Sequence, residues 1–153
     1  MAYSLSMYQA ISIVVFIALK MKEARYEFLT TKHISEILGI ARPTAVKILQ
    51  SLNAAGLIVT KEGAKGGILL ARPVEQITLY DIFEALEGGR PLVRMGMNFQ
   101  PDQCGKEEVE DWMDGRIQLM VQRVDQSLND AEEAMKKSLR EKTIAQVIED
   151  IWF

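Results

Sequence analysis

Cysteine and histidine are nearly absent from this sequence. Its 153 residues contain one cysteine, Cys104, and one histidine, His33. A single thiol excludes an intrachain disulfide framework and is typical of a reducing compartment, so we expect a cytoplasmic protein. A single imidazole excludes a histidine-based metal cage within one chain. We therefore expect neither a metal nor another cofactor.

The sequence also lacks a hydrophobic run long enough to span a bilayer. Its densest apolar stretch, "ISIVVFIAL" at residues 11–19, is followed by Lys20 and Lys22, whereas a membrane-spanning helix needs about 20 apolar residues. Because this stretch does not have the pattern of a basic leader with a small-residue cleavage site, we expect it not to be a secretory signal. Because 48% of the chain is apolar, the stretch predicts a buried first helix at residues 6–22, in one compact domain or a small domain with an appendage.

Positive charge is scarce in the second half of the chain. Residues 1–72 hold nine Lys or Arg against four Glu, a net charge of +5. Residues 73–153 hold nine Lys or Arg against seventeen Asp or Glu, a net charge of −8. A split of this kind indicates a polyanionic partner for the first half only.

Two short helices with a tight turn between them are predicted at residues 31–55. In "KHISEILG", Thr30 or Thr31 is the expected N-cap, Gly39 ends the helix, and the inward stripe is Ile34, Ile37 and Leu38. In "ARPTAVKILQSLNAAG", proline stands in the first turn, glycine follows the end, and the inward stripe is Ala45, Ile48, Leu49 and Leu52. The opposite face is polar and basic. This arrangement is typical of a helix-turn-helix.

A β-hairpin is expected directly after these helices. The β-forming stretches "LIVTK" and "ILLAR" flank a loop with three glycines. Glycine permits positive φ and a close approach of the tip to another surface. A helix-turn-helix followed by such a hairpin is a winged helix, and we expect a mainly helical fold with a small β-hairpin wing.

The second half predicts a long helix that needs a partner. A helix capped by Thr78 and ended by Gly88 is followed by an irregular stretch. From residue 106 to 139, apolar residues then recur every three or four positions, which predicts a long helix. Gly115 lowers the stability of this helix without breaking the pattern. The predicted dimer interface is Met113, Ile117, Met120, Val124, Leu128 and Met135. We expect a homodimer. Its DNA-binding domain is expected at residues 1–89 and a linker or sensor loop at 90–105. The dimerisation helix and a short C-terminal helix capped by Thr143 are expected at 106–153.

Residues 56–88, "GLIVTKEGAKGGILLARPVEQITLYDIFEALEG", resemble the wing and following helix of the Rrf2 family of bacterial transcription regulators. The family pattern there combines A-G-L-V, a glycine-rich turn, L-A-R-P and E-A-L-E-G, and the resemblance extends over essentially the whole chain. It implies a dimeric, DNA-binding winged-helix repressor or activator, and of the two we expect a repressor.

The sequence departs from the family pattern at three places. Glu62 replaces the arginine of the family's wing, and Ile68 replaces its aromatic residue. Many members carry three cysteines about six residues apart that bind an iron–sulfur cluster. Here Cys104 stands alone, with Asn98 and Leu92 at the preceding positions and Glu107 three residues ahead. One thiolate cannot hold such a cluster.

The expected DNA contacts come from the second helix and the hairpin. In the helix they are Arg42, Pro43, Thr44, Lys47 and Ser51, because the N-terminal end of a recognition helix reaches base edges in the major groove. In the hairpin they are Lys61, Lys65, Gly66 and Gly67, which suit a phosphate backbone. A carboxylate is repelled by phosphates, so Glu62 indicates backbone contact and not deep insertion into the minor groove.

Cys104 has two interpretations. It stands just before the long helix, where it is either a redox or electrophile sensor or a structural thiol. Nearby Met95, Met97, Phe99, Trp112 and Met113 either belong to the core or line an effector pocket.

Two other functions stay open from the sequence. The same cationic hairpin and helix could dock an acidic protein instead of DNA. A thiol enzyme would need Cys104 to meet His33, an expected exposed residue at a helix start, and no acidic orienter or oxyanion signature accompanies them. We expect no enzymatic activity.

Overall fold

The computed structural model describes residues 2–23, 29–64, 66–91 and 115–151. Two compact units divide the chain. The first contains Met1–Gly89 together with Ser138–Phe153, and the second contains Arg90–Lys137. The first unit carries the helix pair and the hairpin, and it is the one with the extended core.

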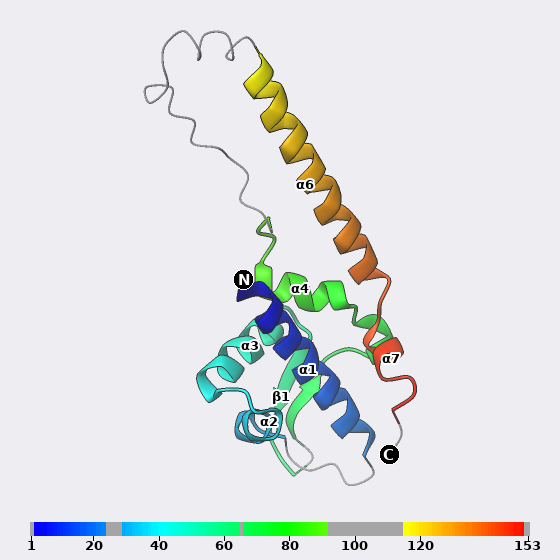
Figure 1. Cartoon of the computed structure of the whole chain (residues 1–153). Helices are drawn as coiled ribbons and strands as arrows, with labels where there is room; N and C mark the ends of the chain where they lie inside the picture. The colour runs from blue at the N-terminus through cyan, green and yellow to red at the C-terminus, as the bar shows by residue number, and fades with distance from the viewer. Residues whose placement is uncertain (1, 24–28, 65, 92–114, 152–153) are drawn as a thin grey trace. The chain divides into compact units, whose positions relative to one another are not determined.

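Helix α1 (Ala2–Lys22) runs through the first unit, with α2 (Thr31–Leu38) and α3 (Arg42–Ala54) on one side and α7 (Ile144–Val147) on the other (Figure 1). The expectation that no run is long enough to span a bilayer is corrected here, because the stretch Leu5–Lys22, longer than residues 11–19, is long and apolar enough by length and composition alone. Core helices of soluble proteins pass the same test. One face of α1 is buried as predicted: Ala10, Ile13, Val14, Ile17 and Ala18.

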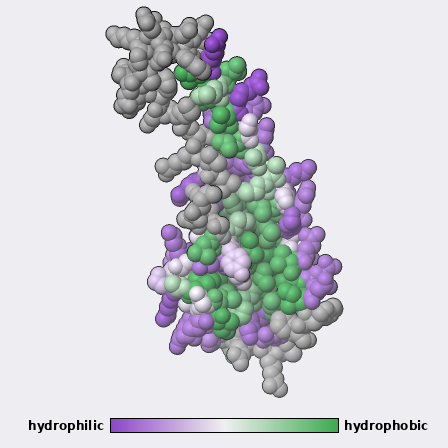
Figure 2. Space-filling view, viewed as in Figure 1, coloured by the Kyte–Doolittle hydropathy of each residue, from purple (hydrophilic) through white to green (hydrophobic). Residues whose placement is uncertain are grey.

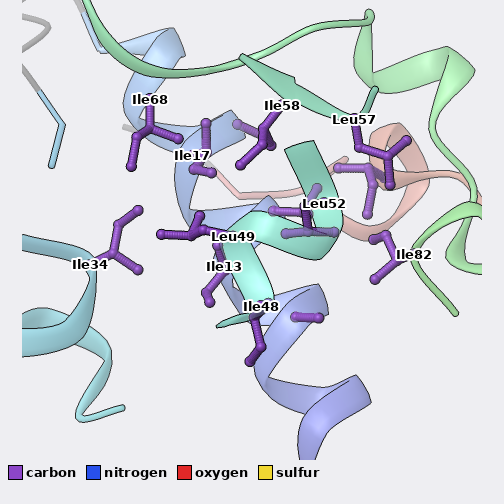
Figure 3. Close-up of a cluster of buried hydrophobic side chains, with 14 of the residues drawn as sticks. Ile13, Ile17, Ile34, Ile48, Leu49, Leu52, Leu57, Ile58, Ile68 and Ile82 are labelled. Carbon is purple, nitrogen blue, oxygen red and sulfur yellow. The ribbon is translucent and has the colours of Figure 1, made fainter. Parts of the chain in front are cut away.

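Side chains from every element of the unit meet in one core. Figure 3 shows Ile13 and Ile17 of α1 facing Leu49 and Leu52 of α3, with further contributions from α2, the hairpin and α4 (Leu79–Glu87). The predicted inward stripe of α3 is buried in full: Ala45, Ile48, Leu49 and Leu52. Burial of this stripe fixes which side of α3 faces out.

Local signals set the ends of α2. The Thr30 hydroxyl oxygen accepts a hydrogen bond from the His33 N–H at 3.3 Å, and Gly39 ends the helix at φ +64°. The Ser35 hydroxyl donates to the Ile40 carbonyl oxygen at 2.6 Å, which closes the turn into α3. The predicted burial of Ile37 is wrong. This side chain is 60% exposed, because the short helix buries a narrow face centred on Ile34.

The wing is the predicted antiparallel hairpin. Strand β1 (Ile58–Lys61) pairs with β2 (Gly67–Leu70) in the register Ile58↔Leu70 to Lys61↔Gly67. The Ile68 N–H donates to the Leu29 carbonyl oxygen at 2.9 Å. Ile68, at the family's aromatic position, is buried, so this branched side chain anchors the hairpin to the core.

The last residues return to the first unit. After the short 3₁₀ helix η1 (Val74–Gln76), Thr78 pairs with Thr143 in an isolated antiparallel bridge. The Leu79 N–H donates to the Lys142 carbonyl oxygen at 2.9 Å, and the Ile144 N–H donates to the Ile77 carbonyl oxygen at 2.8 Å. The domain predicted at residues 106–153 is therefore wrong at its end, because these bonds and the burial of Ile144 and Ile148 hold the C-terminal segment on the winged-helix unit.

Helix α6 (Arg116–Arg140) is the predicted long helix, with a later start. Gly115 takes φ +83°, outside the helical range, and its carbonyl oxygen accepts a hydrogen bond from the Leu119 N–H at 3.0 Å, so α6 begins directly after it. The predicted helical residues 106–114 lie outside the described residues. Along α6, hydrophobic side chains are bordered by hydrophilic ones (Figure 2). Lys136 Nζ lies 3.0 Å from Glu132 Oε1, and this hydrogen bond raises the pKa of Lys136.

Candidate nucleic-acid interface

The outward side of α3 is polar, cationic and open to solvent. Its exposed residues, which we call the outer face of α3, are Arg42, Pro43, Val46, Lys47, Gln50, Asn53 and Ala54. Thr44 and Ser51, the two other predicted contacts, are half-buried at its edges. The five contacts predicted on this helix therefore lie on one side of it. Gln50, expected on the polar face, is exposed there as well, and the structure adds the exposed side chain of Val46.

The N-terminus of α3 differs from those of three other helices. Thr30, Thr78 and Thr143 cap α2, α4 and α7 with their hydroxyl groups. The N-cap of α3 is Ala41, which makes no side-chain hydrogen bond. First-turn N–H groups have no partner within a helix. Pro43 has no N–H, so at α3 the N–H groups of Arg42 and Thr44 are left to solvent or to a ligand. A helix start of this kind, next to the Arg42 guanidinium, favours a phosphate.

The charges of this surface are available to a partner. Within the described part of the chain, Arg42, Lys47 and Lys61 form no ion pair. The Ser51 hydroxyl behaves differently, since it donates to the Lys47 carbonyl oxygen at 3.2 Å. Ser51 can therefore accept a hydrogen bond from a partner, while its donor is used within the helix.

The wing tip presents Lys61, Glu62, Gly63 and Ala64 to solvent. Gly66 is buried, its N–H donates to the Gly63 carbonyl oxygen at 3.0 Å, and a Cβ there would collide with the Lys61 carbonyl oxygen. The Gly66 amide expected to face phosphate is thus used inside the turn. Gly67, also buried, takes φ +91° and pairs with Lys61. These glycines shape the hairpin, which leaves Lys61 as the described cation of the tip.

Arg72 connects the wing to α3 and α4. Its Nη2 donates to the Ala55 carbonyl oxygen at 3.3 Å, and its Nη1 lies 4.0 Å from Asp81 Oδ2. A hollow of about 220 Å³ beside it is lined by Ala55, Leu57, Arg72, Asp81, Glu84 and Ala85. The positive charge of Arg72 was visible in the sequence. Its hydrogen-bond partner Ala55, 17 residues earlier in the chain, was not.

Several predicted residues lie outside the described residues. They are Lys65, Cys104, Met113 and the possible pocket residues Met95, Met97, Phe99 and Trp112. His33 is exposed in the first turn of α2, as expected. Of the predicted dimer residues on α6, Met120, Val124 and Met135 are exposed, and Ile117 and Leu128 are half-buried.

Solved structures share this fold. CymR of Staphylococcus aureus in its oxidized form matches with a TM-score of 0.60 and 20% identity, over 100% of both chains. IscR of T. potens matches with a TM-score of 0.59 and 20% identity, over 99% of this chain and 87% of that one. At these identities the likeness establishes the winged-helix architecture alone.

A relative in sequence covers most of the chain. YwgB of Bacillus subtilis (strain 168), whose name describes it as a candidate HTH-type transcriptional regulator, is 27% identical over 145 residues. The match spans 95% of this chain and 83% of YwgB.

The family model that matches is Rrf2, described as iron-dependent transcriptional regulators. The donor set of this chain does not fit the iron–sulfur centre that its resemblance suggested. Such a cluster is held mainly by several cysteine thiolates, and the sequence has one cysteine and one histidine. In the part of the chain that the structure describes, no three His, Cys, Asp or Glu side chains gather as a metal site. We derive no step through iron.

The match to the family model runs from residue 4 to residue 150, nearly the full length. The helix-turn-helix, the glycine-shaped wing and the long helix after it occupy the matched positions. The chain belongs to the Rrf2 family of transcriptional regulators.

Proposed function

We propose that this chain is a cytoplasmic, sequence-specific regulator of transcription that binds double-stranded DNA as a homodimer and has no enzymatic activity. The observation that carries this proposal is the outer face of α3, where Arg42 and Lys47 form no ion pair with any described residue and the helix start has no side-chain cap. Both features favour phosphate.

In the proposed complex, α3 enters the major groove with its N-terminal end toward the bases. Arg42 and Thr44 lie in the first turn, where the N–H groups can bind phosphate and the side chains can reach base edges. Lys61 of the wing contacts the sugar–phosphate backbone. Glu62, exposed beside it, limits the wing to the backbone because its carboxylate is repelled by phosphates.

The proposed dimer forms through α6. Its 25 residues carry the exposed apolar side chains Leu119, Met120, Val124 and Met135. Burial of such a stripe against the same stripe of a second chain removes apolar area from water and gives a two-fold assembly. A two-fold dimer presents two copies of α3 and predicts a palindromic operator with half-sites one or two helical turns apart.

Repression is the proposed outcome of binding, and Cys104 is the proposed redox trigger. Two Cys104 thiols from paired chains would form a disulfide by losing two protons and two electrons to a peroxide, which is reduced to water. An electrophile could instead alkylate the thiolate. If Cys104→Ser leaves release of DNA by peroxide and by electrophiles unchanged, this trigger is wrong.

Salt dependence of binding tests the proposed function. We expect the affinity for a random duplex to fall linearly with salt on logarithmic axes, because bound cations release counterions from phosphates. Lys47→Ala removes one phosphate contact from each of the two copies of α3, so it should reduce the steepness of that line by about two units per bound dimer. Lys137→Ala, an exposed charge-matched control on α6, should not change it.

The alternative function is binding of an acidic protein through the same cations. In that case the affinity for duplex DNA would not fall steeply with salt concentration. A flat salt response, or no binding to duplex, would contradict the proposal and favour that partner.

A further inference from the structure

Val46 is an apolar side chain in the middle of a polar surface. It is 37% exposed, while the apolar residues that α3 needs for the core, Ala45, Ile48 and Leu49, are buried beside it. Valine also fits a helix less well than alanine, because its branched Cβ restricts χ1 against the preceding turn. Neither the core nor the helix accounts for valine at this position.

The neighbours of Val46 define a line along the helix. Residues four apart share one face, so Arg42, Val46 and Gln50 follow one another along the outer face of α3, and all three are exposed. Pro43 and Lys47 form the adjacent line. A partner that lies along this face therefore meets a cation, then an aliphatic group, then a carboxamide.

The major groove of DNA offers a matching order of groups. Thymine alone among the bases places a methyl group there, and small aliphatic side chains contact it. A glutamine side chain pairs with adenine through two hydrogen bonds, to N6 and N7. The four residue-to-residue steps from Val46 to Gln50 rise about 6 Å along the helix, which corresponds to about two base-pair steps of 3.4 Å.

We propose that Val46 and Gln50 specify the operator, with Val46 against the methyl group of a thymine and Gln50 paired with an adenine about two base pairs away. This inference rests on the proposed DNA binding and extends it from phosphate contact to base choice. The outer face then adds discrimination at Val46 and Gln50 to the contacts proposed for its first turn, while Lys47 supplies affinity for any duplex.

Substitution of the DNA tests the Val46 contact without altering the protein. Sites are first selected from random duplex DNA with the full chain, and each thymine of the selected half-site is then replaced by deoxyuridine, which lacks only the methyl group. At one thymine we expect binding to weaken about fourfold, as for the loss of one buried methyl-sized group. Wild-type affinity that is unchanged at every thymine would overturn the proposal for Val46.

A matched pair of variants assigns the effect to residue 46. Val46→Thr keeps the branched shape and one methyl group, so it should retain the sensitivity to deoxyuridine. Val46→Ser lacks the methyl groups and should bind both sites equally. Lys47→Ala, next on the helix, should weaken binding to both sites alike. Full deoxyuridine sensitivity in Val46→Ser would overturn the assignment.

Gln50 has its own readout in the same selection. Gln50→Ala should lose at least about fivefold of the preference for adenine at one position, the lower end of the discrimination by a bidentate contact. An unchanged preference would remove Gln50 from the proposal. Binding to duplex without any of these effects overturns this inference alone, whereas no duplex binding overturns the proposed function and this inference with it.

Discussion

The Arg72 guanidinium donates a hydrogen bond to the carbonyl oxygen of Ala55, the C-cap residue of α3, at 3.3 Å. The last carbonyl groups of a helix have no partner within it, so this bond satisfies one of them from outside. Asp81 lies 4.0 Å from the other guanidinium nitrogen. Arg72 therefore fixes the end of α3 relative to the wing and to the first turn of α4.

We expect Arg72→Ala to lower the free energy of unfolding by about 1 kcal/mol, the usual net contribution of one such hydrogen bond. Urea-induced unfolding at one fixed protein concentration measures it, with Arg90→Ala, an exposed arginine of the same charge, as the control. An unfolding midpoint equal to that of wild type would show that the contact contributes nothing to stability.

Gly66 and Gly63 of the wing differ in the room they leave for a side chain. A Cβ there collides with the backbone of Lys61, whereas at Gly63 it meets nothing within 4 Å. Gly66→Ala should therefore open the hairpin and lower the melting temperature clearly. Gly63→Ala, strained only by its φ of +104°, should cost about 1–3 kcal/mol. Amide exchange of β1 and β2 reports the hairpin directly, and equal effects of the two substitutions would refute the steric explanation.

Thr78 and Thr143 are two helix caps joined by one bridge. Each hydroxyl accepts from a backbone N–H, of Asp81 at 3.1 Å and of Gln146 at 3.2 Å, and the two residues pair across the chain. Thr→Val keeps the shape and removes the hydroxyl, so each single variant should lose about 1 kcal/mol. Because the caps share the bridge, the double variant should depart from additivity by at least about 0.5 kcal/mol in a double-mutant cycle. Strict additivity would mean that the two caps act independently.

Features with a local signal were predictable from the sequence. Threonine before a helix and glycine after it gave the ends of α2 and α4, and the three-to-four spacing gave the buried stripe of α3. Partners far apart in the chain were not predictable in this way. The contact of Arg72 with Ala55 and the return of Ile144 to the core join segments that no periodicity relates.

The candidate site shows the same division. The cationic side of α3 follows from the position of its buried stripe, so Arg42 and Lys47 were found. Gly66 was expected to offer its amide to phosphate, but glycine spacing alone does not distinguish an open N–H from one that closes a turn. Val46 was overlooked because an apolar residue next to a core stripe is usually assigned to the core.

Val124 lies in the second unit, on α6, and is 48% exposed in the single chain. If α6 pairs with a second copy, a charge there must be buried in an apolar contact, which is unfavourable without a partner of opposite sign. Val124→Asp should therefore shift the protein from dimer to monomer in sedimentation at micromolar concentration, while its far-ultraviolet circular dichroism stays that of a folded helical protein. Gln126→Asp, an exposed change nearby on the same helix, controls for added negative charge and should remain dimeric. A wild-type protein that sediments as a monomer would refute the assembly, and a dimeric Val124→Asp variant would place the interface elsewhere.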